Sequence, residues 1–428
     1  MLWAAVDGTT TNAPSPTWCN EVAAIVEQHC VRCHQHGGPA PFALNTYALV
    51  SARSAFIGEV IRQGVMPPPL AASFGAHVDG AAAMTASQRA VVLAWINGGS
   101  PKGECNAAPL QVDVPAARAD LHVSSAGVWP MPAEGGKNWG RRIRDKRSFV
   151  LPLQSKSPLR IQAMTIRSGV PEAVHAVTLA ADTQGRGRWA DQREEGEGYR
   201  MLGNVGWTPS GSAGGAGIGG RTWRLPNGFH WAIEAGADLV AEVHFRPDGR
   251  VHELAPSVDV ELAEAGPSRP LRTLVSMVRK LDVAIGATET ATDTLVLEHD
   301  VDLVALTPRA NGVCTALSIE AHRPDGTVAS LVEIDDWDPH WRRPLMLKAP
   351  IRLLAGTRLE SSWTIANTKA NPRNPFLPLE RYSVAMRTGA VAWLLHVAAV
   401  DASDDIALDP WTQNQLLKRQ RDLKVESR

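Results

Sequence analysis

The pentapeptide Cys30-Val31-Arg32-Cys33-His34 constrains this chain more than any other stretch. Two thiols with two residues between them lie one helical turn apart, which matches the separation of the two vinyl groups of a porphyrin. The histidine that follows is then placed to bind an iron ion from one face. The pentapeptide therefore predicts a covalent haem c on Cys30 and Cys33, with His34 as an axial iron ligand.

Two other kinds of site use a C-x-x-C pair. A structural zinc site needs a second Cys/His pair at a matching spacing, and the other three cysteines of the chain are isolated in the sequence. A thioredoxin-like redox site needs a βαβ context, which the pattern does not predict. Haem attachment is the interpretation that we favour.

Helical patterns surround the pentapeptide. Val22, Ile25 and Val26 repeat at helical spacing just before it. Residues 46–61 predict a second helix, and Thr85-Ala86-Ser87-Gln88 is a capping box that opens a third. Three or four helices around a C-x-x-C-H motif are typical of a small all-α, class I-like cytochrome c.

A methionine between the second and third helices is a candidate for the sixth iron ligand. Met66 stands in Val65-Met66-Pro67-Pro68-Pro69, where the prolines restrict the loop and fix the position of the sulfur. A thioether is a soft ligand that favours reduced iron and raises the haem potential. A core methionine is the structural alternative. The weaker candidates for this position are Met84, His29, His36 and His77.

Composition is that of an ordinary soluble globular protein, with 428 residues, 44% hydrophobic residues and a formal net charge of −1. This charge predicts no nucleic-acid partner, and no stretch approaches the length of a membrane-spanning helix. Haem c is attached outside the bacterial cytoplasm, so we expect a periplasmic or secreted protein whose leader is absent from this sequence. Cys19 and Cys105 flank the haem segment and predict either a disulfide or two buried free thiols.

Beyond residue 111 the pattern changes to short alternating runs between turn clusters, as in antiparallel β-sandwiches. The runs are Phe149–Leu153, Leu159–Met164, Ala237–Val243, Leu295–Leu306, Cys314–His322, Ile351–Leu354 and Leu359–Ile365. The turn-rich segment Gly266–Pro270 divides them into two groups. Asp409-Pro410-Trp411 predicts the start of a terminal helix, with proline at its first position.

The expected protein is therefore multidomain. Its parts are a lead-in over residues 1–16, a cytochrome c domain over 17–110, two antiparallel β-sandwiches over 111–265 and 266–400, and a short helical tail over 401–428.

Short segments from residue 20 to 395 share their order with a known family. They are Cys30–His34, Gly37–Phe42, Met66–Pro68, Ala94–Gly99, Gly206–Pro209, Leu225–Gly228, Val243–Phe245, Arg323–Thr327 and Asn371–Pro375. In these segments the chain resembles the bacterial copper type II, ascorbate-dependent monooxygenase-like proteins, which are related to peptidylglycine and dopamine monooxygenases. Many of these proteins carry an N-terminal cytochrome c module. The resemblance implies two tandem, jelly-roll-like sandwiches that bind copper.

The resemblance also implies one electron-relaying copper on three histidines of the first sandwich. A Val-His-His pattern of the family corresponds here to Val174-His175-Ala176, and a Val-His-Tyr pattern matches His244. Two candidate ligands, His175 and His244, therefore remain for a residual copper, and a tight site would need a third donor. The other histidines that would supply one are His230, His252, His322, His340 and His396.

The catalytic copper of the family is implied to bind a His-x-His after a proline, and a distant methionine. Here Pro308 is followed by Arg309-Ala310-Asn311, and the methionine position matches Trp393. Arginine carries a permanent positive charge and no lone pair, so Arg309 opposes metal binding. We therefore assign no catalytic residue.

Three functions are compatible with this pattern. The favoured one is a haem c electron-transfer or redox-partner protein with a non-catalytic, monooxygenase-like body. The alternatives are an active haem-fed copper monooxygenase and a pseudoenzyme subunit, which would assemble with an intact homologue or a larger periplasmic complex. The sequence does not identify the redox partner.

Overall fold

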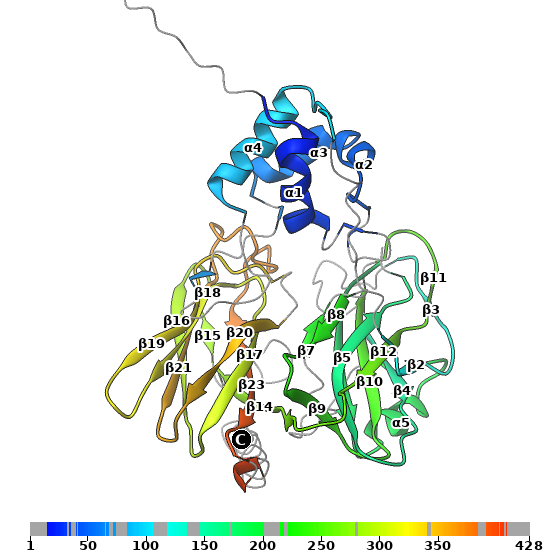
Figure 1. The fold of residues 1–428 in the computed structure, drawn as a ribbon, viewed down its shortest axis with the longest axis vertical. Coiled ribbons are helices and arrows are strands. Elements are labelled where there is room, and N and C mark those ends of the chain that lie inside the picture. The colour runs from blue at the N-terminus through cyan, green and yellow to red at the C-terminus, as the bar shows by residue number, and fades with distance from the viewer. Residues whose placement is uncertain are drawn as a thin grey trace, which may run out of the picture. The chain divides into compact units, whose positions relative to one another are not determined.

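The computed structural model of the chain divides into two compact units (Figure 1). The helical unit comprises residues 1–36, 42–67 and 83–113, and the β unit comprises 37–41, 68–82 and 114–428. The residues that the structure describes are 15–31, 34–35, 40, 42–64, 66–67, 72–73, 84–105, 118–134, 146–170, 173–200, 215–217, 221–245, 247–278, 281–339, 344–383, 391–401, 403–405 and 408. The predicted terminal helix after Asp409 lies outside them.

The helical unit packs short helices around one apolar core that includes Trp18, Val26, Ile57 and Trp95. A continuous helical run leads into the C-x-x-C-H motif, with α1 (Ala23–Val26) between the wider turns η1 (Trp18–Val22) and η2 (Glu27–Val31). It is followed by α2 (Tyr47–Ser51), α3 (Ser54–Arg62) and α4 (Ala86–Asn97).

Two of the predicted helices can be compared in detail. The capping box before α4 is confirmed, since Thr85 and Gln88 each accept the other's backbone N–H. The single helix predicted over residues 46–61 is wrong. It is interrupted at Arg53, whose backbone leaves the helical region, and it forms α2 and α3 instead.

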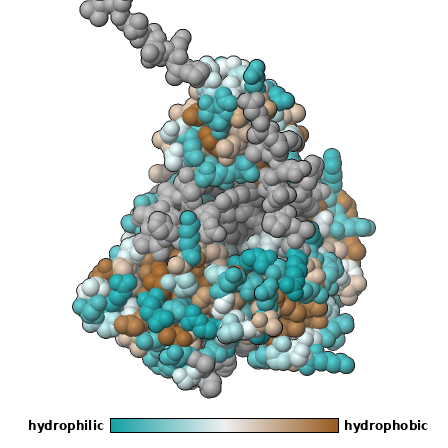
Figure 2. Space-filling view, viewed as in Figure 1, coloured by the Kyte–Doolittle hydropathy of each residue, from teal (hydrophilic) through white to brown (hydrophobic). Residues whose placement is uncertain are grey.

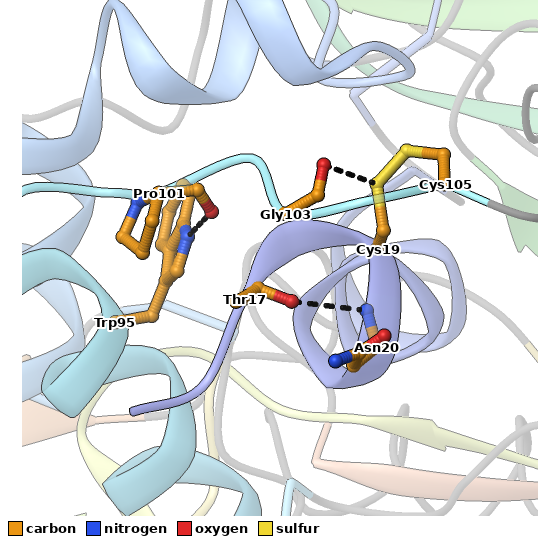
Figure 3. Close-up of a disulfide and its surroundings, with 7 residues drawn as sticks. All are labelled: Thr17, Cys19, Asn20, Trp95, Pro101, Gly103 and Cys105. Carbon is orange, nitrogen blue, oxygen red and sulfur yellow. Dashed lines mark hydrogen bonds between the residues drawn. A yellow bond between two sulfur atoms is a disulfide. The ribbon is translucent and has the colours of Figure 1, made fainter. Parts of the chain in front are cut away.

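A disulfide joins Cys19 of η1 to Cys105, and the two Cα atoms are 5.0 Å apart (Figure 3). The segment before Cys105 is held beside η1 by backbone bonds from Trp18 N–H to Pro101 O and from Cys19 N–H to Lys102 O. Of the two alternatives that the sequence left open for this pair, the structure has the disulfide.

The β unit is built from sheets that are antiparallel apart from one short parallel pair, which confirms the expected β-sandwich architecture in outline. Its first half pairs a four-stranded sheet with a larger one around a core that includes Phe149, Ile161 and Leu239. In spatial order the strands are β4 (Lys146–Pro152), β10 (Asp238–Phe245), β6 (Val174–Asp182) and β7 (Gly215–Gly217), and then β13 (Arg269–Pro270), β9 (Phe229–Ile233), β5 (Leu159–Arg167), β12 (Ser257–Leu262) and β2 (Leu121–Ser124). The smaller elements are β8 (Arg221–Arg224), β3 (Trp129–Met131), β11 (His252–Leu254) and α5 (Arg186–Asp191).

The second half has its own core, which includes Leu306, Ile319, Trp363 and Trp393. One sheet has the order β14 (Arg272–Met277), β23 (Ala392–Ala399), β17 (Val301–Arg309) and β20 (Leu345–Leu353). The other has the order β1 (Ala72–Ser73), β19 (Val328–Ile334), β18 (Cys314–His322), β21 (Arg358–Ala366) and β16 (Thr288–Val296). A small pair is formed by β15 (Asp282–Val283) and β22 (Tyr382–Ser383).

The strand predicted over Leu295–Leu306 is wrong. β16 ends at Val296 and β17 begins at Val301. The chain reverses between them through a polar stretch, where the Asp300 carboxylate accepts the backbone N–H of Ala355 at 2.7 Å.

Hydrophilic and hydrophobic residues are interspersed on the visible face of the molecule (Figure 2). The exposed large apolar side chains of the β unit, such as Val251, Val328 and Leu377, are far apart in the sequence. Single exposed side chains of this kind are ordinary and need no partner. Among the described residues, no helix is long and apolar enough to cross a membrane.

Candidate functional site

His34 lies one helical turn beyond Cys30, and its backbone N–H donates to Cys30 O at 2.9 Å. The ring atom Nδ1 lies 3.0 Å from the carbonyl oxygen of Phe42. A carbonyl oxygen can only accept, so Nδ1 carries the hydrogen. This bond therefore selects the tautomer in which Nε2 keeps its lone pair, which is the arrangement that metal-binding histidines use.

Burial lowers the pKa of His34 below its ordinary value, and the hydrogen bond to Phe42 offsets this only in part. The ring is consequently neutral near pH 7. Neutral imidazole is the form that ligates a metal.

Aromatic side chains adjoin the His34 ring. The Phe42 ring centroid lies 4.6 Å from that of His34 and 6.3 Å from that of Phe56. The Arg53 guanidinium lies over the Phe42 ring at 5.0 Å. Phe56 is 57% exposed, which leaves a large apolar side chain in water beside Phe42. A flat apolar cofactor bound at His34 would find apolar surface here.

Met66 follows α3 in a loop, and its backbone N–H donates to Val60 O at 3.2 Å. It is 40% exposed, so it is not a core residue, whereas its competitor Met84 is 4% exposed and belongs to the core of the helical unit. None of the contacts between described residues joins Met66 to His34. Cys33, His36 and His77 lie outside the described residues.

In the β unit, the side chain of His244 engages a carboxylate. Its Nε2 lies 3.0 Å from Glu242 Oε1, and Lys146 Nζ lies 3.0 Å from the same oxygen. His175 lies on the adjacent strand β6, where the register against β10 shifts after His244. The backbone thus brings the two predicted copper ligands onto neighbouring strands, and only the backbone of His175 is described.

The residues at the positions where the resemblance implies a catalytic copper have other partners in the structure. Asn311 Nδ2 donates to the Tyr382 hydroxyl at 2.8 Å, and Trp393 is fully buried with Nε1 donating to Ser318 O at 3.2 Å. Arg309 ends β17. In the part of the chain that the structure describes, no three His, Cys, Asp or Glu side chains are grouped to hold a metal ion.

The other histidines engage polar partners. His396 lies between two hydroxyls, with Thr273 Oγ1 at 3.3 Å from Nδ1 and Thr307 Oγ1 at 3.0 Å from Nε2. His230 Nδ1 lies 2.6 Å from Ser268 Oγ. Burial lowers the pKa of both histidines to about 4, with neighbouring arginines adding to the effect. Of the other histidines named as possible third copper donors, His252 bonds to Asp248 and His322 lies beside Glu320 and Glu360. His340 lies outside the described residues.

Sequence reasoning missed two features of these sites. Phe42 adjoins His34, and Phe56 in turn adjoins Phe42, through loop and helix packing that no local pattern predicts. Glu242 precedes His244 by two residues, and residues at that spacing share one face of a strand. The partnership of Glu242 with His244 therefore had a signal in the sequence.

No family model and no curated protein matches this chain. Among solved structures it has weak similarity to the major capsid protein P2 of bacteriophage PM2, with 11% identity, coverage of 66% of this chain and 98% of that chain, and a TM-score of 0.23. A putative alpha-L-fucosidase from Bacteroides ovatus gives 14% identity, 65% and 39% coverage and a TM-score of 0.17. VP54 of PBCV-1 gives 8% identity, 66% and 97% coverage and a TM-score of 0.23. Similarities at these TM-scores carry no argument about function.

Proposed function

We propose that the chain is a haem c electron-transfer or redox-partner protein whose β unit does not perform copper catalysis. One observation carries the proposal: the C-x-x-C-H histidine, His34, donates from Nδ1 to Phe42 O and so keeps the lone pair of Nε2. Binding of iron through Nε2 requires this tautomer, so the hydrogen bond suits His34 to the ligand role that its motif predicts.

The donor set fits a haem. Cys30 and Cys33 would hold the porphyrin through thioether bonds, His34 would bind the iron through Nε2, and Met66 is the proposed sixth ligand. The haem would supply a one-electron couple. The chain orients the His34 ring through Phe42 O and provides apolar surface at Phe42 and Phe56.

The body of the protein is proposed to be a degenerate relative of copper monooxygenases. Arg309, Asn311 and Trp393 occupy the positions where the resemblance implies copper ligands, and the last two are engaged in other hydrogen bonds. An active monooxygenase is the alternative that these contacts disfavour. A pseudoenzyme subunit of a larger complex is compatible with the proposal.

A periplasmic or secreted location is part of the proposal. The disulfide between Cys19 and Cys105 supports it, because disulfides persist in oxidising compartments.

The test is maturation of the full chain in a bacterial periplasm that attaches haem c, followed by absorption spectroscopy and metal analysis. We expect one covalent haem and one iron per chain, no stoichiometric copper, and loss of covalent haem in a Cys30→Ser, Cys33→Ser variant. A chain that matures without covalent haem would refute the proposal, and stoichiometric copper with substrate hydroxylation would favour the monooxygenase. Purification at native abundance separates the subunit alternative, since a co-purifying chain would support it.

A further inference from the structure

β16 is an edge strand that is open to another strand. Among the described strands, it ends the sheet of order β1, β19, β18, β21 and β16, so that only β21 pairs with it. All nine of its residues, Thr288–Val296, pair with β21 in one unbroken register. The strand contains no proline and no lysine. Proline, lysine and bulges are features with which proteins keep an edge strand from pairing with another chain.

The two other edge strands of similar length are protected. The outer edge of β4 is bonded at Ser148 to Tyr199, by Ser148 N–H to Tyr199 O at 2.7 Å and by Tyr199 N–H to Ser148 O at 2.8 Å. β20 contains Pro350, and its register against β17 shifts. In the part of the chain that the structure describes, β16 is thus the long edge that lacks such protection.

The side chains of β16 divide between two faces. Leu295 belongs to the core of the second sandwich, so the odd positions face that core. The even positions face outward, and their side chains are exposed and uncharged: Thr288, Thr290, Thr292, Thr294 and Val296.

The charge of Asp293 does not block the edge. Asp293 stands at an odd position, and its Oδ2 accepts the Ser276 hydroxyl at 2.8 Å and the Met277 N–H at 3.1 Å. Both donors belong to β14, in the opposite sheet of the same sandwich. The carboxylate is therefore directed between the two sheets, and the outer face of β16 carries no charged side chain.

We propose that β16 is a homodimer interface, at which it pairs antiparallel with β16 of a second copy of the chain. A twofold axis perpendicular to the sheet continues the sheet across both copies and keeps their outer faces on one side. Outward-facing residues must then lie opposite outward-facing residues, so the axis passes through a residue rather than between two residues. The proposal does not depend on the haem.

The charges of the strand select the position of the axis. Thr292 is the midpoint of β16, so an axis there pairs all nine residues and opposes no two like charges. An axis one residue earlier would place Glu289 opposite Asp293 of the second copy, and an axis one residue later would place Asp293 opposite itself. Like charges directly opposite each other destabilise a strand pair, whereas threonine pairs stabilise it. We therefore place the axis at Thr292, with Thr290 opposite Thr294.

The first test places a charge on the axis. In Thr292→Lys, the two new side chains of a dimer would start from Cβ atoms about 5 Å apart, so the dissociation constant of the dimer should weaken by about tenfold or more. The matched control is Ser362→Lys, since Ser362 lies opposite Thr292 on β21 and faces the same side. Its two copies would be about 14 Å apart in the dimer, beyond the screening length of about 8 Å at physiological ionic strength. The control should therefore dimerise like the wild type.

The measurement is sedimentation velocity of the full-length protein from about 1 μM to 1 mM, with the Tm of each variant recorded to show that the fold is retained. A wild type that stays monomeric over this range would overturn the proposal. A dimer that Thr292→Lys leaves unchanged, or that Ser362→Lys weakens equally, would also overturn it, because the copies would then associate through another surface.

The second test fixes the register. Thr292→Lys and Thr292→Glu should each be mainly monomeric where the wild type dimerises, and an equimolar mixture should restore the dimer, because the axis sets opposite charges against each other. A mixture that stays monomeric would overturn the axis at Thr292. If Thr292→Lys does not fold, the double variant Thr290→Lys, Thr294→Glu provides the test. Each new charge would then face its opposite in the second copy, so the dimer should tighten, and an unchanged or weaker dimer would overturn the register.

Discussion

Removal of the disulfide between Cys19 and Cys105 should destabilise the helical unit and leave the β unit unchanged. The two cysteines are 86 residues apart in the sequence, and the loop they close contains all the helices of that unit after η1. The chain-entropy relation for a loop of this length gives a stabilisation of about 4.6 kcal/mol. Residual structure in the opened state reduces this stabilisation, so we expect about 3–4.5 kcal/mol.

The variant is Cys19→Ser, Cys105→Ser, in which both thiols are replaced so that neither can pair with another cysteine. The measurement is native-state hydrogen exchange read by peptide, in wild type and variant at the same haem content. The free energy of opening should fall by that amount for peptides of α1 and α4, and stay constant for peptides of β18.

The matched control is Cys314→Ser, which alters a buried thiol in the β unit. It should lower protection in β18 and leave α4 unchanged. If protection of α4 in the double variant stays within about 1 kcal/mol of the wild type, then the disulfide does not restrain the opened helical unit, and the loop-entropy reasoning is refuted.

Three further predictions concern other parts of the chain. The fold lowers the pKa of His396 to about 4, so as pH falls below 6.5 the unfolded chain binds a proton that the folded chain does not. The free energy of unfolding should therefore decrease between about pH 6.5 and pH 4, and in His396→Asn this decrease, measured by chemical denaturation, should be smaller by about 3 kcal/mol. In the haem-loaded protein, Met66→Ala should abolish the sulfur-to-iron absorption feature and lower the potential, whereas the core substitution Met84→Ala should lower stability by about 2–5 kcal/mol and leave that absorption in place. Gly312→Ala should lower the Tm strongly, because the added Cβ would collide with the carbonyl oxygen of Arg373; a Tm equal to that of the wild type would show that this loop can move aside.

Strand positions could be predicted wherever alternation and turn residues agreed. Cys314–His322 alternates between turns, and β18 has those bounds. The strand predicted over Ile351–Leu354 overlaps only the end of β20, which begins at Leu345. Pro350 interrupts the pattern there, and the strand tolerates a proline because β20 is an edge strand whose register against β17 shifts. Edge position and register are tertiary facts that a local pattern does not contain.

The candidate sites were predictable to a similar extent. The C-x-x-C-H run identifies His34 as a candidate ligand from spacing alone. Its partner Phe42 O is eight residues away across a loop, and a backbone acceptor in a loop leaves no pattern in the sequence. The charge of Arg309 alone predicts that it is unsuited to metal, whereas the neighbours of its strand, β23 and β20, are remote in the sequence and leave no local pattern.

Two histidines of this chain show how the site of hydrogen bonding decides which of them is suited to a metal. His34 uses Nδ1 as a donor to a carbonyl oxygen, so Nε2 keeps its lone pair and points to an iron-binding role. His244 uses Nε2 itself, and its acceptor is the Glu242 carboxylate, so Nε2 carries the hydrogen. A copper ion at that nitrogen would have to displace the proton and break the contact with Glu242, so its binding would release a proton and weaken as pH falls. His34 thus keeps the Nε2 lone pair that a metal ligand needs, whereas Nε2 of His244 is bonded to a carboxylate, and this difference agrees with the proposal of iron rather than copper.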